Sequence, residues 1–117
     1  MAYPGDTIDY GGGVAVTTRQ TATIASGVLT VTDLTRIIEV IGEGAANDQL
    51  DTFTVTNKNV DDTVMLISDG SDTITVDDAN IDLGAANRAV APGGNIVLRW
   101  DGTSWVEVSF LGGADNA

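Results

Sequence analysis

The sequence predicts an all-β fold, a jelly-roll-like antiparallel β-sandwich with an extended N-terminal arm. Thr, Val and Ile make up 37 of the 117 residues, and side chains that are stiff at χ1 suit the pleated surface of a strand. Apolar and polar residues alternate in short segments that end at Gly, Asn, Asp or Pro. No window places apolar residues at helical spacing over three turns, so we expect neither a helix nor the helical crossovers of a parallel α/β sheet.

The chain divides into three predicted parts. Residues 1–20 contain Tyr3-Pro4-Gly5 and three glycines at 11–13 around a short polar stretch, a composition that rarely packs into its own core. We therefore predict an extended arm at 1–20, a β-sandwich body at 21–111 and a disordered tail at 112–117. The arm is interpreted either as a floppy terminus or as a segment that becomes ordered on a partner.

Alternation predicts ten short strands, each bounded by turn residues. They span residues 14–18, 21–24, 28–32, 36–41, 52–56, 63–68, 73–76, 80–83, 95–100 and 105–110. The segment 46–53 comes nearest to a helical pattern, but its Thr-rich continuation favours a strand. Short, evenly spaced strands are typical of sandwiches and barrels.

The last two strands form the clearest hairpin, NIVLRWDGTSWVEVSF at 95–110. With a three-residue loop at 101–103, Trp100 lies on an apolar face and Trp105 on the opposite, mixed face. A four-residue loop instead turns Glu107 toward the core, which is costly for an unpaired carboxylate. The sequence therefore favours the three-residue loop, whose glycine supplies the positive φ.

This register gives the two tryptophans different roles. Trp100 is predicted to cap the core, while Arg99 is predicted to lie over the ring of Trp105. An aromatic ring beside an arginine is the composition of an interface hot spot. We therefore predict that Arg99 and Trp105 lie at a subunit interface, with an exposed tryptophan that contacts only its own chain as the alternative.

The composition argues against several classes of function. The chain has no cysteine and no histidine, which removes disulfides, thiolate and imidazole catalysis, and nearly all zinc sites. Five basic residues against 17 acidic ones give a net charge of −12, which disfavours binding to nucleic acid or to an anionic membrane. No apolar run long enough to span a membrane and no signal peptide is present. We expect a soluble protein made in the cytoplasm, without a cofactor and without enzymatic activity.

Two short motifs resemble parts of known ligand-binding sites. Gly42-x-Gly44 follows an apolar strand, but Glu43 would repel a pyrophosphate and no helix is expected after it, so a tight turn is the better interpretation. Seven aspartates and no basic residue lie between 61 and 82. Their spacing excludes an EF-hand. A weak cation site on these loops and ordinary turn-forming aspartates are both left open.

Four segments resemble β-rich modules of tailed-bacteriophage virions. They are GVLTVT (27–32), IGEGAANDQLDTFT (41–54), DTVMLISDGSDTITVDDANIDLG (62–84) and GGNIVLRWDGTSWVEVS (93–109). The closing hairpin is the most specific of them, although Trp100 stands where tyrosine is more usual. Modules of this kind occur at the ends of tail fibres and as small capsid decoration, or cement, proteins.

The resemblance implies a non-enzymatic homotrimer that belongs to the virion. With a predicted arm and no shaft repeat, the sequence favours a decoration protein that binds the major capsid protein on the outer capsid surface and stabilises the shell. A tail-fibre or spike tip that binds a host-surface receptor is the alternative. The arm residues expected to contact the capsid are Tyr3, Pro4, Ile8 and Tyr10.

Overall fold

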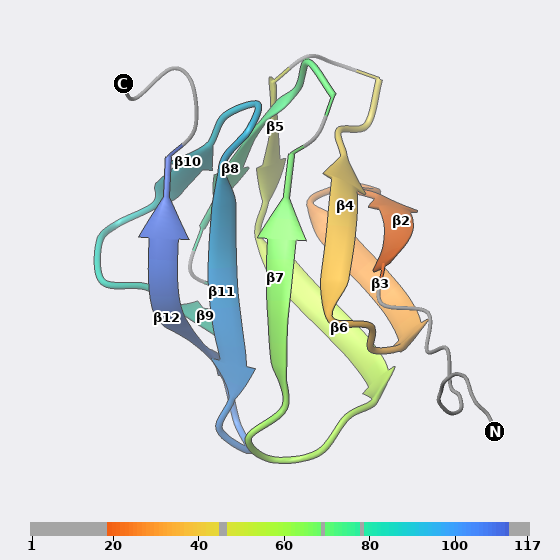
Figure 1. The fold of residues 1–117 in the computed structure, drawn as a ribbon, viewed down its shortest axis with the longest axis vertical. Helices are drawn as coiled ribbons and strands as arrows, with labels where there is room; N and C mark the ends of the chain where they lie inside the picture. The colour runs from red at the N-terminus through yellow and green to blue at the C-terminus, as the bar shows by residue number, and fades with distance from the viewer. Residues whose placement is uncertain (1–18, 45–46, 69, 78, 113–117) are drawn as a thin grey trace, which may run out of the picture.

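The computed structural model describes residues 19–44, 47–68, 70–77 and 79–112, and this part of the chain consists of strands and connections (Figure 1). Its strands are β2 (Arg19–Thr23), β3 (Val28–Asp33), β4 (Ile37–Ile41), β5 (Asn47–Leu50), β6 (Thr52–Asn57), β7 (Thr63–Ile67), β8 (Thr73–Val76), β9 (Ile81–Asp82), β10 (Arg88–Val90), β11 (Asn95–Trp100) and β12 (Trp105–Leu111). The all-β prediction is confirmed. Within these residues no helix has the length and apolarity needed to cross a membrane.

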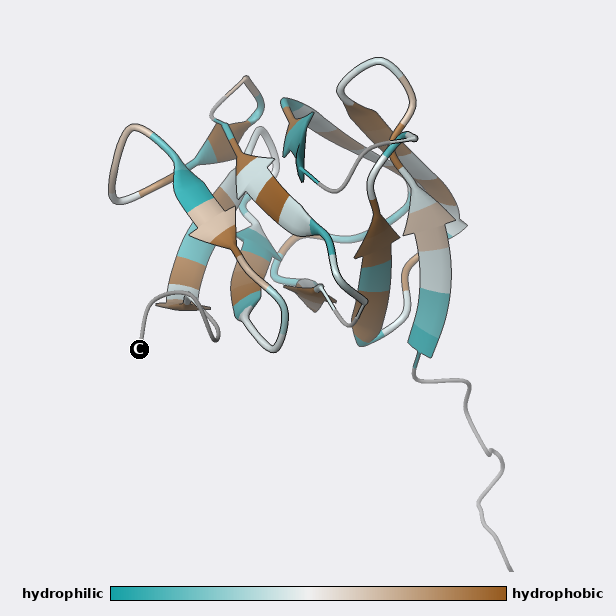
Figure 2. Ribbon diagram, turned by 90° about the horizontal axis from the view of Figure 1, so that it is seen from above, coloured by the Kyte–Doolittle hydropathy of each residue, from teal (hydrophilic) through white to brown (hydrophobic). Residues whose placement is uncertain are grey.

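The strands form two layers. A six-stranded sheet in the order β2-β4-β7-β11-β12-β9 makes one layer. A three-stranded sheet, β10-β8-β5, and a two-stranded sheet, β3-β6, lie behind it and make the other (Figure 1). Seen from above, hydrophobic and hydrophilic bands alternate along the strands of both layers (Figure 2).

The pairing differs from the predicted antiparallel jelly roll. Five of the eight pairings between described strands are parallel: β2–β4, β4–β7, β3–β6, β5–β8 and β9–β12. The chain passes from the six-stranded sheet to the opposite layer and back, so that successive coils stack in a solenoid-like way. The antiparallel pairings of the described strands are β8–β10, β7–β11 and β11–β12. The prediction assumed that parallel strands need helical crossovers, but here strands of the opposite layer make the crossovers.

The core lies between the two layers. Ile38, Leu66 and Ile96 stand in register on β4, β7 and β11, and each is at most 2% exposed. Phe53 from the opposite layer lies 4.8 Å from the ring of Trp105, measured between ring centroids. Burial of these side chains is the main source of stability, at roughly 2–3 kcal/mol for each large apolar side chain.

Asn80 completes the edge of the two-stranded sheet. Its Oδ1 accepts a hydrogen bond from the backbone N–H of Phe53 at 2.9 Å, and its Nδ2 donates to the Phe53 carbonyl at 2.8 Å. The backbone carbonyl of Asn80 accepts a hydrogen bond from the N–H of Trp105 at 3.0 Å. The Asn80 side chain therefore satisfies the backbone hydrogen-bonding groups of Phe53 at the edge of β6, where a third strand would otherwise be needed. The Asn80 backbone links this edge to β12.

The β11–β12 hairpin closes with the four residues 101–104, so the predicted three-residue loop is wrong. Asp101 explains the loop, because its Oδ1 accepts hydrogen bonds from the backbone N–H groups of Ser104 at 2.7 Å and Thr103 at 2.8 Å. These bonds favour the charged carboxylate and hold the pKa of Asp101 below its ordinary value. Gly102, with φ of +103°, adopts the left-handed conformation that the loop needs.

The observed register places both tryptophans on the inner side of the sheet. Trp100 packs against the core as predicted, but Trp105 is 0% exposed, and its predicted place on the outer face is wrong. The two ring centroids are 5.3 Å apart. Lys58, not Arg99, makes the cation–π contact, with its Nζ 4.5 Å from the ring centroid of Trp100. Arg99 points outward and pairs with Asp61 at 3.2 Å.

Glu107 lies opposite Leu98, an arrangement that was predicted to be too costly for an unpaired carboxylate. Arg88 on β10 makes it favourable, because its Nε and Nη2 donate to the two carboxylate oxygens at 3.0 Å and 2.9 Å. The backbone N–H of Gly84 adds a third bond at 2.9 Å. The arginine, followed by the Gly84 bond, lowers the pKa of Glu107. Val108 has no partner on β11 and forms a β-bulge. Beyond the bulge the register shifts by one residue, so that Phe110 pairs with Ile96.

Other boundaries differ in detail. β5 and β10 have no counterpart among the predicted strands, although 46–53 was interpreted as strand-forming. Arg19 and Gln20 belong to β2, so that a strand begins inside the segment predicted as an arm. The rest of that arm, including the predicted strand 14–18, lies outside the described residues.

Candidate interaction surface

The aspartates between 61 and 82 were interpreted either as a weak cation site or as turn-forming residues. The described residues contain no group of three or more acidic side chains that could hold a metal ion. Aspartates of the 61–82 segment act singly on loops: Asp62 accepts the backbone N–H of Asn59 at 2.7 Å, and Asp72 accepts that of Gly42 at 3.0 Å. The Asp62 contact is of the turn-forming kind that the sequence left open, whereas the Asp72 contact joins two loops that are 30 residues apart in the chain. Two of the seven aspartates lie outside the described residues.

The outer face of the six-stranded sheet is the most unusual surface of the described chain. In β4 and β7, inward residues are buried while their neighbours face outward and are half-exposed or exposed. A sheet face in contact with water usually carries polar residues. Eight of the outward residues of this sheet are instead apolar, although polar side chains such as Thr21, Glu39, Thr63, Asn95 and Ser109 lie among them: Ile37, Ile41, Met65, Ile67, Val97, Val106, Val108 and Leu111. Val108 and Leu111 are 56% and 58% exposed.

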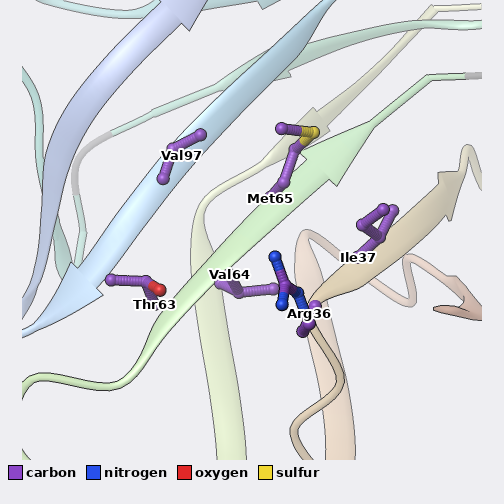
Figure 3. Close-up of a pocket in the computed structure, with 6 residues that line it drawn as sticks. All are labelled: Arg36, Ile37, Thr63, Val64, Met65 and Val97. Atoms are coloured by element: carbon purple, nitrogen blue, oxygen red, sulfur yellow. The ribbon is translucent and has the colours of Figure 1, made fainter. Parts of the chain in front are cut away.

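A groove of about 430 Å³ lies in this outer face. Figure 3 shows its lining, in which Ile37, Met65 and Val97 come from three adjacent strands. Met65 is the direct cross-strand neighbour of both Ile37 and Val97. The three side chains therefore form a continuous apolar floor, and Arg36 and Thr63 lie at one end of it.

Arg36 gives the groove its charge. It is exposed and lies at the start of β4, where its backbone carbonyl accepts a hydrogen bond from the N–H of Met65 at 2.9 Å. Its guanidinium has no hydrogen bond or ion pair with any residue that the structure describes. A guanidinium beside an apolar floor suits a ligand that presents a carboxylate next to an apolar side chain.

The distribution of charge sets this face apart from the rest of the molecule. Three of the five basic residues of the chain, Arg19, Arg36 and Arg99, lie on or beside it. Arg19 pairs with Glu39 at 3.1 Å, and Arg99 pairs with Asp61 at 3.2 Å. The face is therefore close to neutral in a chain of net charge −12.

The predicted contact residues meet different outcomes. Arg99 lies on the outer face, with its side chain 40% exposed, and so remains available to a partner. Trp105 is completely buried within its own chain and offers no ring to another subunit, which corrects the prediction. The arm residues Tyr3, Pro4, Ile8 and Tyr10 lie outside the described residues.

Sequence reasoning missed Arg36, Met65 and the apolar floor, although a signal was present. The strands IIEVI (37–41) and TVMLI (63–67) are apolar at almost every position. Near-continuous apolar runs indicate a strand that is covered on both faces, whereas alternation indicates one that is covered on a single face.

Comparison with known proteins adds no further constraint. No protein-family model matches the chain, and no curated protein shows significant similarity to it. The inference about function therefore rests on the surface described above and on the resemblance in sequence.

Proposed function

We propose that this chain is a non-enzymatic capsid decoration protein of a tailed-bacteriophage virion, which binds the outer capsid surface as a homotrimer and stabilises the shell. The observation that carries the proposal is the groove in the outer face of the six-stranded sheet, where Arg36 lies beside a partly exposed apolar floor of Ile37, Met65 and Val97. Apolar patches of this kind mark protein contacts. In place of the jelly roll, we propose a solenoid-like body for this module.

A ring of three copies fits the charge distribution. In a closed trimer each subunit offers one surface to the next and accepts a different one from the previous. The apolar face, with Arg36 at its groove, complements an acid-rich surface, and a chain with 17 acidic residues supplies such a surface.

Binding to the shell follows from the same logic. A protein that binds only the assembled capsid stabilises it by mass action, and three subunits at a three-fold site multiply weak contacts through effective concentration. The predicted capsid contacts are Tyr3, Pro4, Ile8 and Tyr10. The major capsid protein is the proposed partner, and the outer capsid surface is the proposed location.

The test has two measurements. Light scattering should give the mass of a trimer for the parent protein, and Met65→Glu with Val97→Glu should weaken association at least tenfold. Thr54→Glu, an exposed change on β6 in the other layer, is the matched control and should leave the trimer intact. A parent protein that is monomeric at all concentrations would refute the proposal.

The second measurement is sedimentation with purified empty capsids. Binding should saturate near the number of three-fold sites on the shell. A trimer that ignores capsids and binds host cells would instead establish the alternative, a tail-fibre or spike tip.

A further inference from the structure

The apolar floor of the groove in the outer face belongs to a row of residues that starts at Arg19, the first described residue. Arg19 on β2 lies opposite Ile37 on β4. Ile37 lies opposite Met65 on β7, which in turn lies opposite Val97 on β11 (Figure 3). Since neighbouring strands are about 4.8 Å apart, the row from Arg19 to Val97 spans roughly 15 Å. The chain that precedes Arg19 therefore joins the body beside this groove.

Residues 6–10, Asp-Thr-Ile-Asp-Tyr, match the chemistry of the groove. In an extended chain, alternate side chains point to the same side, so Asp6, Ile8 and Tyr10 share one face. That face carries a carboxylate followed by two large apolar side chains over roughly 13 Å. The groove carries the complementary order, with the exposed guanidinium of Arg36 at one end of an apolar floor.

We propose that residues 6–10 dock in the groove of their own chain in the free subunit, with Asp6 at Arg36 and with Ile8 and Tyr10 on the apolar floor. This inference rests on the proposed function and adds a regulation to it. The docked segment covers the surface through which the trimer is proposed to form, so it competes with the neighbouring subunit. Contact of Ile8 and Tyr10 with the shell, as predicted from the sequence, releases the groove.

The connection is long enough for docking within one chain. Tyr10 precedes Arg19 by nine residues, and an extended chain of that length spans roughly 30 Å. This is about twice the distance from Arg19 to Val97 along the row. The three glycines at 11–13 lie within the connection, and glycine adopts the backbone conformations that a reversal of the chain needs.

The concentration of the competing segments favours the same chain over a free copy. A short flexible connection gives a tethered segment an effective concentration on the order of 1 mM. Free subunits at micromolar concentration present the same segment about a thousandfold more dilute. The ion pair between Asp6 and Arg36 adds little affinity at an exposed site, but it fixes the direction in which the segment lies.

The absence of cysteine allows a direct cross-linking test. The double variant Ile8→Cys with Met65→Cys is oxidised at a concentration where light scattering shows dissociated subunits. Its main product should be a disulfide within one chain. Ile8→Cys with Thr54→Cys, an exposed position on β6 in the other layer, is the matched control and should close at least tenfold more slowly. Equal rates would refute docking, and a main product that joins two chains would refute docking within one chain.

A charge exchange tests the direction of the docked segment. In the Ile8→Cys with Met65→Cys background, Arg36→Glu should slow closure at least threefold, because it places two carboxylates together. Addition of Asp6→Arg should restore the rate, since the exchanged pair is again attractive. A rate that is unchanged by Arg36→Glu, or not restored by Asp6→Arg, would overturn the pairing.

Association of the subunits tests the competition. Ile8→Ser with Tyr10→Ser should strengthen formation of the trimer at least threefold in light scattering, because no segment has to leave the groove. Weaker association would refute the competition. Equal closure of the two double-cysteine variants beside a trimeric parent removes the docking and leaves the decoration trimer. A monomeric parent with rapid closure within one chain removes the trimer and leaves the docking.

Discussion

Both faces of the six-stranded sheet carry large apolar side chains, but among the described residues only those of the inner face are fully covered. On the inner face, Ile38 and Leu66 are at most 2% exposed, because the second layer packs on them. On the outer face, Ile37 and Met65 of the same strands stay partly exposed. The apolar residues of a strand indicate how many of its faces are favoured to be buried. They do not indicate whether the same chain or another molecule buries each face. Substitutions on the two faces should therefore have different effects.

The largest effect is expected on the inner face, at Trp105. Trp105→Ala removes a completely buried ring that packs on Phe53 and Trp100, so the free energy of unfolding should fall by about 3–5 kcal/mol. Urea unfolding followed by circular dichroism measures this change. Trp100→Ala is the control and should cost less, because Trp100 is only partly buried. Equal losses would mean that the two rings share the inner face equally.

The next largest effect is expected at the edge of β6 in the two-stranded sheet. Asn80→Ala removes both side-chain hydrogen bonds to the backbone of Phe53, and it should lower the free energy of unfolding by roughly 1–3 kcal/mol. The same urea titration applies, with exposed Asn87→Ala as the control. A variant as stable as the parent would show that water replaces the amide at this edge.

A smaller, pH-dependent effect on stability is expected at the ion pair between Arg88 on β10 and Glu107 on β12. The pKa of Glu107 is lowered in the folded state, chiefly by Arg88. Its contribution to stability is therefore fully present above the ordinary glutamate pKa of about 4.3 and is lost as the pH falls through the lower folded value. Glu107→Gln should lower the melting temperature at neutral pH and reduce the loss of stability on acidification.

The exposed aspartate Asp82 supplies the control for this pH dependence. Asp82→Asn should leave the acid profile of the parent unchanged. If parent and Glu107→Gln lose stability in parallel between pH 5 and pH 2, the pair of Glu107 and Arg88 contributes nothing to acid sensitivity.

The smallest effect on folding is expected on the outer face. Val108→Ser changes a side chain that is 56% exposed, so the free energy of unfolding of the isolated subunit should change by no more than about 0.5 kcal/mol. Urea unfolding at a concentration where the subunits are dissociated measures this. A loss above 2 kcal/mol would show that the outer face is already covered by the chain's own residues.

Local pattern predicted much of the fold but not its topology. Strands 73–76 and 95–100 were predicted with their observed bounds, because alternation and flanking turn residues are local signals. The parallel stacking depends on contacts between residues 18 to 28 positions apart, such as Arg19 with Ile37 and Ile37 with Met65. No local pattern records which distant strand becomes the neighbour.

The candidate surface shows the same division. Arg99 was predicted to face outward, and it does, since its direction follows from alternation along β11. Trp105 was placed on the wrong face because a single residue of loop length reverses every side chain of the following strand. Arg36 was missed because it becomes part of a groove only when β4, β7 and β11 lie side by side.

The sequence by itself determined that this chain forms strands, that it is strongly acidic, and that it lacks imidazole and thiol groups, because these follow from composition and from spacing between near neighbours. Only the tertiary structure decided the register of the last hairpin. The carboxylate of Glu107 can face inward because Arg88, 19 residues earlier, lies within hydrogen-bonding distance. Whether a buried charge is costly depends on its partner, and folding brings that partner into place.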